Sequence, residues 1–195
     1  MLTSYGSLFF DQYQSYIAET ETIHENRDLI LALDDPSHLS GRVFQDAKFT
    51  RAVPFAPEKP IAEIESIVED ATKIRGFSPV VVGRYVSLFH EKVTEETLDA
   101  ELIISPDVFD YLAETWPEQL KEALSMGLTV FVTDETLPYG LILIDEPTAQ
   151  LCLVFYEDGS LRGVVQNDQP DVIEWGTDLY EAYRRRAHEP SISSE

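Results

Sequence analysis

The chain has 195 residues, of which 44% are hydrophobic and 11% aromatic, a little more than one typical domain with enough apolar side chains for a core. This composition excludes an intrinsically disordered protein. The 36 acidic residues against 14 basic ones give a formal net charge of −22, which argues against direct binding to DNA, RNA or an anionic membrane surface.

The first predicted element is a long helix over residues 4–32, a span without proline, with Ser4 as its N-cap. Apolar residues recur there every seven positions, at Leu2, Phe9, Tyr16, Ile23 and Ile30. The partner positions three residues further on are apolar only at the two ends, so the pattern is half of a coiled-coil seam. Two interpretations stay open: a stripe packed on the helix's own domain, or a dimerisation contact through Phe9, Tyr16, Ile23 and Ile30.

Strands and helices alternate through the middle of the chain. We predict a short helix over 39–45. Strands are then expected over 47–53, 74–77, 98–104 and 128–133, and the helices between them over 61–72, 82–93, 107–115 and 117–125. Three consecutive strands and a closing helix follow, over 139–144, 150–156, 161–166 and 170–188.

This order predicts an α/β fold with a mixed sheet, parallel in its first half, and helices on both faces. We therefore divide the chain into a linker or dimerisation helix (1–33), an α/β domain (34–188) and a disordered tail (189–195).

Polar residues follow three of the strands that are predicted to be parallel. Ser78 and Ser105 are each followed by proline and a helix, and Thr133 and Asp134 end the third strand. Loops after parallel strands gather at one edge of a sheet, where helix N-termini expose N–H groups, so we expect a ligand crevice there. Arg84, near the start of the next helix, would reach an anion in it. The alternatives are ordinary helix capping by the serines and a surface ion pair for Arg84.

Most motifs for catalysis and metal binding are absent. Cys152 is the one cysteine, which excludes a disulfide framework and a multi-cysteine metal site. Glu21 and His24 supply one of the two Glu-x-x-His pairs that a carboxylate di-iron bundle needs. The nucleophile elbow, the dinucleotide-binding glycine motif and the P-loop are absent. The sequence therefore predicts no catalytic residue, no metal and no cofactor.

No apolar run reaches the roughly 18 residues of a membrane-spanning helix, and the first ten residues lack a signal-peptide pattern, so we expect a cytoplasmic protein. Lysine is scarce beside the many carboxylates, which is the surface expected of a halophilic protein. In multimolar salt the Debye length falls to about 3 Å, so self-repulsion is screened. The alternative is an ordinary acidic protein, and stability at low salt distinguishes the two.

Several stretches resemble one family: Gly-Phe-Ser-Pro-Val-Val over 76–81, Ala-Glu-Leu-Ile-Ile-Ser-Pro over 100–106, the strand end at 130–134, and 163–168 with 174–176 and 179–180. Together they are similar to the C-terminal domain of archaeal winged-helix transcription regulators of the methanogenesis-regulator type. The resemblance covers about residues 2–187. It implies a fold like one half of the phospholipase-D architecture. Those enzymes need a His-x-Lys motif, and His90 with Lys92 has this spacing. His90, however, follows Val86 on an apolar stripe of a predicted helix, which is typical of a core histidine, so we expect no such activity.

The resemblance also implies a role. In that family the DNA-binding domain lies directly upstream, and residues 2–6 resemble the end of its wing, so we expect a fragment that contacts DNA only through that domain. We therefore expect an effector-sensing and dimerisation domain that forms a homodimer. Its small-molecule effector would be held in the crevice predicted at the strand ends, near Ser78, Arg84, Ser105, Thr133 and Asp134. Two alternatives stay open: a dimerisation or protein-interaction module without a ligand, and an uncharacterised enzyme.

Overall fold

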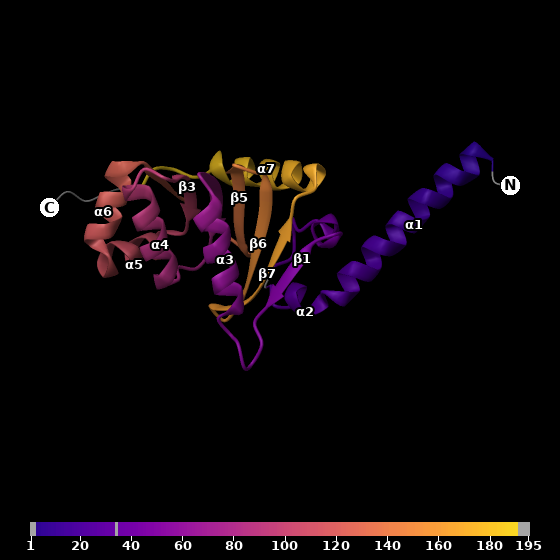
Figure 1. Ribbon diagram of the computed structural model, residues 1–195, viewed down its shortest axis with the longest axis horizontal. Coiled ribbons are helices and arrows are strands. Elements are labelled where there is room, and N and C mark those ends of the chain that lie inside the picture. Colours follow the sequence, from indigo (N-terminus) through magenta and orange to yellow (C-terminus); the bar gives the residue numbers. More distant parts are fainter. Residues whose placement is uncertain (1–2, 34, 191–195) are drawn as a thin grey trace.

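The computed structural model describes residues 3–33 and 35–190, which are built around one mixed seven-stranded sheet (Figure 1). The strand order is β1-β7-β6-β5-β2-β3-β4. Strands β2, β3 and β4 run parallel, while β5, β6 and β7 form an antiparallel meander whose last strand pairs with β1. The bounds are β1 (Lys48–Arg51), β2 (Lys73–Ser78), β3 (Asp99–Ile104), β4 (Leu128–Val132), β5 (Gly140–Glu146), β6 (Gln150–Glu157) and β7 (Ser160–Asn167).

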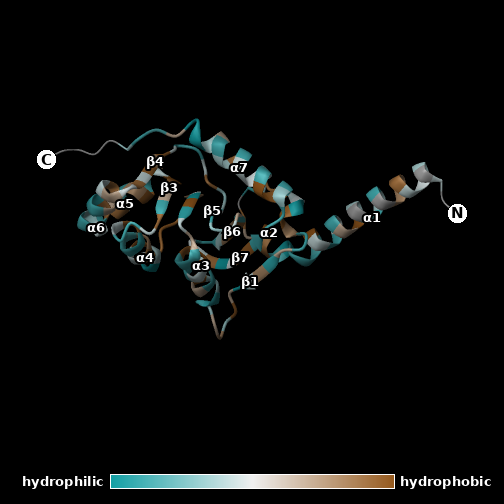
Figure 2. Cartoon of the chain, turned by 45° about the horizontal axis from the view of Figure 1, so that its top comes forward, coloured by the Kyte–Doolittle hydropathy of each residue, from teal (hydrophilic) through white to brown (hydrophobic). Residues whose placement is uncertain are grey.

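Helices cover both faces of the sheet, as the sequence predicts (Figure 2). One face carries α3 (Lys59–Asp70), α4 (Gly83–Thr94), α5 (Pro106–Thr115) and α6 (Pro117–Met126). The other carries α7 (Pro170–Arg184), with α2 (Arg27–Ile30) and the 3-10 helix η1 (Gly41–Phe44). Because side chains alternate along a strand, Ile74 of β2 packs with α3, while Phe77 lies on the other face. The Phe77 ring contacts the Tyr183 ring of α7 in a tilted arrangement, with 4.9 Å between the ring centroids.

Local signals explain most element ends. Asp158 and Gly159 both have positive φ, 50° and 72°, as the two-residue turn between β6 and β7 requires. Gly127 ends α6 with φ 121°. Strand β6 is buried on both faces over Leu151–Tyr156, which is why its sequence is a continuous apolar run. The expected alternation of elements is confirmed, with boundaries that move by a few residues.

The first helix differs from its prediction in two respects. α1 (Ser4–Glu25) ends before Asn26, and α2 follows as a separate turn. Asn26 is 4% exposed; its Nδ2 donates to the Thr22 carbonyl at 2.8 Å and its Oδ1 accepts from Arg51 of β1, so it serves as a joint to the sheet. The N-cap is Thr3 rather than Ser4, because the Thr3 hydroxyl oxygen accepts from the Gly6 N–H at 3.1 Å.

The end of the chain also departs from its prediction. The closing helix ends at Arg184 rather than at 188. Residues beyond it turn along the edge strand β4, where His188 and Val132 exchange two backbone hydrogen bonds of 3.0 and 2.8 Å. This pairing covers part of an otherwise open sheet edge. Most of the predicted tail, 191–195, lies outside the described residues.

Candidate functional site

The parallel strands bring three of the predicted polar residues to one edge of the sheet. Ser78 is in register with Ile104, and Ile104 with Val132, so Ser105 and Thr133 lie at the same level of the strand ends, one residue beyond Ser78. Ser105 is the N-cap of α5, and its Oγ accepts from the Val108 N–H at 3.3 Å. Thr133 is buried, and its Oγ1 accepts from a backbone N–H at 3.3 Å. Asp134, next to Thr133, is exposed.

Arg84 is engaged in ion pairs. It is exposed at the start of α4 and pairs with Glu65 at 2.8 Å and Glu58 at 3.4 Å. These carboxylates belong to α3 and to the turn before it, so the guanidinium links two helices on the molecular surface. The surface ion pair is therefore the arrangement that the structure contains, and ligand contact by Arg84 stays a prediction.

A cavity of about 140 Å³ lies between the sheet and the layer of α4, α5 and α6. Its walls are almost entirely apolar and come from the strand faces, the loop after β2 and the three helices. Among the predicted site residues, only Ser78 lines it. Prominent lining side chains are Val82, Val86, Phe89, Leu102, Ile104, Val108, Leu112, Leu120, Ala123, Ile142 and Val154. Sequence reasoning missed this cavity because each of these residues looks like ordinary core.

Few polar groups belong to the cavity. The Tyr85 hydroxyl is buried and has no hydrogen-bond partner among the described residues. Burial raises the pKa of Tyr85 far above its usual value of 10, so the hydroxyl keeps its proton. Burial likewise raises the pKa of Tyr156 to about 12, against the lowering effect of a hydrogen bond with Ser78. The Ser78 hydroxyl donates to the Val80 carbonyl at 2.7 Å. Among the described lining residues there is no Lys, Arg, Asp or Glu.

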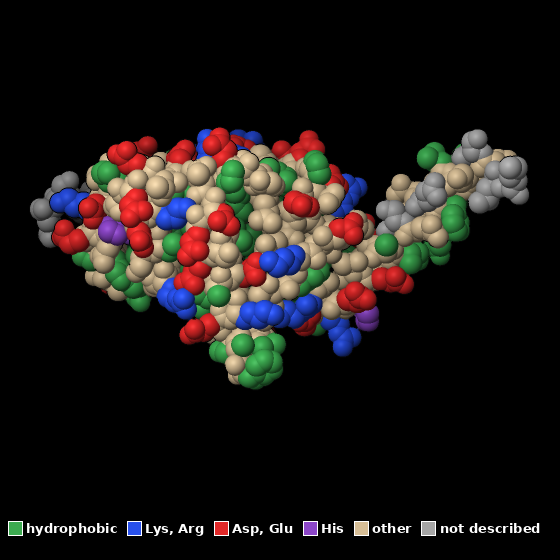
Figure 3. Space-filling view, in the orientation of Figure 1, with side chains coloured by type: hydrophobic (Ala, Val, Ile, Leu, Met, Phe, Trp, Pro, Cys, Tyr) green, Lys and Arg blue, Asp and Glu red, His purple; other side chains and the backbone are tan. Residues whose placement is uncertain are grey.

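The second feature is the apolar side of α1, which extends away from the sheet (Figure 1). Figure 3 shows hydrophobic side chains along this projecting helix. Phe9 is 68% and Tyr16 63% exposed, and with Tyr5 and Ile23 they fall within about 40° around the helix axis. Ile23 lies against Gly41, and Ile30 packs on the domain core. Of the four predicted contact residues, Phe9 and Tyr16 are therefore the ones that stand clear of the domain.

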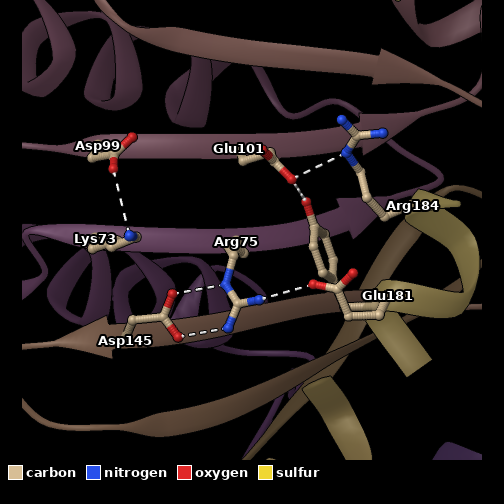
Figure 4. A network of polar contacts seen from close by, with 8 residues as sticks. Lys73, Arg75, Asp99, Glu101, Asp145, Glu181 and Arg184 are labelled. Atoms are coloured by element: carbon tan, nitrogen blue, oxygen red, sulfur yellow. Dashed lines mark hydrogen bonds and ion pairs between the residues drawn. The ribbon is translucent and has the colours of Figure 1, made fainter. Parts of the chain in front are cut away.

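A network of charged groups fastens α7 to the sheet (Figure 4). Arg75 of β2 donates two hydrogen bonds to Asp145, of 2.8 and 2.9 Å, and pairs with Glu181 of α7 at 3.4 Å. Its hydrogen bonds to Asp145 raise the pKa of Arg75 above its usual value. Glu101 of β3 accepts from the Tyr180 hydroxyl and from Arg184. The charged groups of this network are paired with one another, so the network holds α7 on the sheet and is not an open binding site.

Other classes of site are not built by the described part of the chain. No group of three or more His, Cys, Asp and Glu side chains there is placed to hold a metal ion. The single thiol, Cys152, is buried, and burial raises its pKa well above the usual value. No helix over these residues is long and apolar enough to cross a membrane.

Comparison with known proteins identifies one sequence family. Residues 57–186, two thirds of the chain, match the family described as the middle domain of the methanogenesis regulatory protein FilR1. A search of curated proteins found no match.

Solved structures show which folds are similar. TrmBL2, an archaeal chromatin protein, aligns with a TM-score of 0.57 at 10% identity, over 94% of this chain and 66% of TrmBL2. The phospholipase D family member Nuc from Salmonella typhimurium gives 0.54 at 12% identity, over 74% of this chain and 98% of Nuc. NucT from Helicobacter pylori gives 0.54 at 9% identity, with the same coverages. At these identities the likeness concerns the fold alone, and it confirms the expected phospholipase-D-like architecture.

Proposed function

Since the chain belongs to the FilR1 middle-domain family of archaeal transcription regulators, we propose that it senses a small-molecule effector and joins two regulator subunits. The cavity beside Ser78 carries the sensing part of this proposal. Ligand pockets are mostly apolar clefts with few polar groups, and the walls of this cavity are almost entirely apolar. Ser78 places the cavity next to the carboxyl ends of the parallel strands, where open α/β sheets bind ligands.

The subunit contact is the role proposed for α1. Contiguous exposed aromatic side chains on a helix mark an interaction surface, and a second copy of the same helix offers a complementary one. The net charge of −22 opposes binding to a phosphate backbone, so DNA would be contacted by a separate domain.

Signal transfer requires that the effector bind two arrangements of the dimer with different affinity. The joint at Asn26 supports such a coupling, because Arg51 of β1 holds both Asn26 and, at 3.1 Å, Asp28 of α2. A shift of the sheet relative to its helices would thus change the direction of α1.

Light scattering tests the subunit contact in multimolar KCl. The wild-type chain of 22.1 kDa is expected to form a dimer, and Phe9→Glu with Tyr16→Glu to give a folded monomer. Leu31→Glu is the control, because Leu31 is 78% exposed and lies beyond α1. A wild-type monomer, or a double variant that still dimerises, would remove this role from α1.

Thermal unfolding with a panel of cellular metabolites tests the sensing role. A ligand at about a hundred times its dissociation constant adds about 2.7 kcal/mol, which raises the midpoint by roughly 5–10 °C. If the effector reaches the strand edge, Ser105→Ala and Arg84→Ala weaken its binding without unfolding the domain. Unchanged binding in both variants would withdraw these two residues from the site.

A second candidate function is dimerisation, or docking of another protein, without any small ligand. The exposed apolar side of α1 favours it independently of the cavity. Its signature would be a dimer whose stability responds to no metabolite of the panel.

A further inference from the structure

We infer that a polar cleft between α3 and one end of the sheet binds a short aliphatic diamine in its doubly protonated form. The cleft has a volume of about 550 Å³ and is open to solvent. It lies at the opposite end of the sheet from Ser78, so the inference does not depend on the sensing role proposed for the cavity.

The walls of the polar cleft come from separate parts of the chain. They are one side of α3, the turn between β5 and β6, the first residue of β1 and the end of β7. Strand pairing sets Lys48 of β1 beside Gln166 of β7, and both side chains reach Glu63 of α3. The charged and amide side chains of the cleft are those of Lys48, Glu63, Asp70, Gln150, Gln166 and Asp168.

The charge of the cleft favours a cation. Its lining has one positive group, Lys48, and three carboxylates, Glu63, Asp70 and Asp168, which leaves a net charge of −2. Lys48 pairs with Glu63, whereas the ion pairs of the described residues include neither aspartate. Asp168 accepts one hydrogen bond, of 3.2 Å, from Gln169. A ligand with two positive charges would neutralise the cleft, and an anion would be repelled.

Gln166 distinguishes this place from the rest of the acidic surface. It is 5% exposed, and its Nε2 donates to Glu63 at 2.7 Å. Its Oε1 accepts no hydrogen bond from the described residues, although buried side-chain oxygens normally have a partner. This oxygen is not among the partnerless atoms that are closed off from solvent, so a ligand in the cleft can reach it.

The hydrogen-bond donors of the site are already engaged. Lys48, Thr50 and Gln166 all donate to Glu63, and these hydrogen bonds hold the pKa of Glu63 below its usual value, so that it stays ionised. What the cleft still offers is acceptors, namely the Gln166 carbonyl oxygen and the two aspartates. The ligand must therefore bring the donors, and an ammonium group brings three N–H donors together with a positive charge.

Apolar side chains also line the cleft and account for the aliphatic part of the ligand. They belong to Ile67, Ala71, Ile144, Pro147 and Ala149. A methylene chain that lies against them is removed from water, in the way that the stems of lysine side chains cover apolar surface. An aliphatic spacer between two ammonium groups thus matches both kinds of wall.

Three probes of similar length test the ligand class by ligand-observed NMR on the full chain. Putrescine carries two positive charges, butylamine carries one and butanediol carries none. The titrations are made in about 1 M KCl, where the Debye length is about 3 Å and the overall charge of the protein contributes little. We expect putrescine to bind more tightly than butylamine, and butanediol not to bind.

A double variant, Asp70→Asn with Asp168→Asn, locates the binding. Both side chains are exposed, so the domain should stay folded. The affinity for putrescine should fall about fivefold or more, because two charge contacts are lost. Glu69→Gln with Asp178→Asn is the matched control, since it makes the same change of charge at exposed positions outside the cleft and should leave the affinity unchanged.

Gln166→Met tests the free carbonyl oxygen. It keeps the length of the side chain and removes the acceptor, so putrescine should bind more weakly. It also removes one donor to Glu63, and Thr50→Val is the control for this effect, because Thr50 donates to Glu63 but does not line the cleft. If Gln166→Met does not fold, the two double variants still decide.

Three results would overturn the inference: no binding of putrescine, equal binding of butanediol, or an equal loss of affinity in the cleft variant and its matched control. The sensing role of the cavity is judged separately. A metabolite that stabilises the Asp70→Asn, Asp168→Asn variant as strongly as the wild type binds outside the polar cleft.

Discussion

Lys92 shows how much a single side chain contributes between two helices of the fold. It lies on α4, and its Nζ donates to the carbonyls of Val68, Glu69 and Ala71 at the C-terminal end of α3. These carbonyls lie at the end of the helix, where the negative end of its dipole is, and the Val68 carbonyl also accepts from the Ala71 N–H at 3.2 Å. The ammonium group therefore caps α3 and fastens α4 to it.

We predict that Lys92→Met lowers the free energy of unfolding by about 2 kcal/mol, because hydrogen bonds to a charged group are lost and carbonyls stay unpaired. The unfolding midpoint should drop by roughly 4–8 °C. Lys121→Met, at an exposed lysine of α6, is the control with the same chemical change. Equal stability of the two variants would contradict a capping role.

Glu63 of α3 is the carboxylate with the clearest pH signature. Burial pushes its pKa upward, but hydrogen bonds from Lys48, Gln166 and Thr50 outweigh this and hold the pKa below its usual value of 4.5. The ionised form is thus favoured in the folded state. Its contribution to stability is present above about pH 4.5 and is lost as the pH falls through the lowered value.

Acid titration of unfolding checks this sign. In Glu63→Gln, part of the stability lost below about pH 4.5 should already be missing at neutral pH, so the acid slope becomes shallower. Glu69→Gln, at an exposed position of the same helix, should keep the wild-type slope. A slope that is identical in both variants would contradict the assigned pKa direction.

The position of α1 depends on a contact with a distant strand. Asn26 separates α1 from α2 and bonds to Arg51, which lies 25 residues away on β1. Arg51 also lies over the ring of Phe49, with its Cζ 5.3 Å from the ring centroid. The joint therefore belongs to the sheet as much as to the helix.

Asn26→Ala should destabilise the chain by about 1–2 kcal/mol, because it removes both side-chain hydrogen bonds of a buried residue. Alanine also favours a continuous helix across the joint. Hydrogen exchange should then show slower exchange of the backbone amide at position 26 and faster exchange in β1. Unchanged hydrogen exchange in β1 would mean that the contact between Asn26 and Arg51 does not stabilise this strand.

The charge of the whole molecule sets its response to salt. The chain has 36 acidic and 14 basic residues, and many of its lysine and arginine side chains are already engaged in ion pairs. The remaining carboxylates repel one another across the surface. Raising the ionic strength from about 0.1 M to about 1 M shortens the Debye length from about 10 Å to about 3 Å and weakens that repulsion.

We predict that the unfolding midpoint rises steadily with KCl over this range and continues to rise toward multimolar salt. Calorimetry or circular dichroism at each concentration measures it. Replacing several exposed glutamates of α4 and α6 by glutamine should flatten the dependence without changing the fold. A midpoint that is independent of salt would favour an ordinary acidic protein over a halophilic one.

The amino-acid sequence by itself determined the order of elements, the mixed sheet and the gathering of Ser78, Ser105 and Thr133 at one edge. These features follow from local periodicity, turn residues and the geometry of parallel strands, which act over a few neighbouring residues.

Tertiary structure alone decided the rest. The cavity has walls from separate strands and helices, and Arg84 of α4 pairs with Glu65 of α3. The break at Asn26 depends on Arg51 in the same way. Periodicity within one element carries no information on such contacts, because they depend on the packing of segments that lie far apart in the chain.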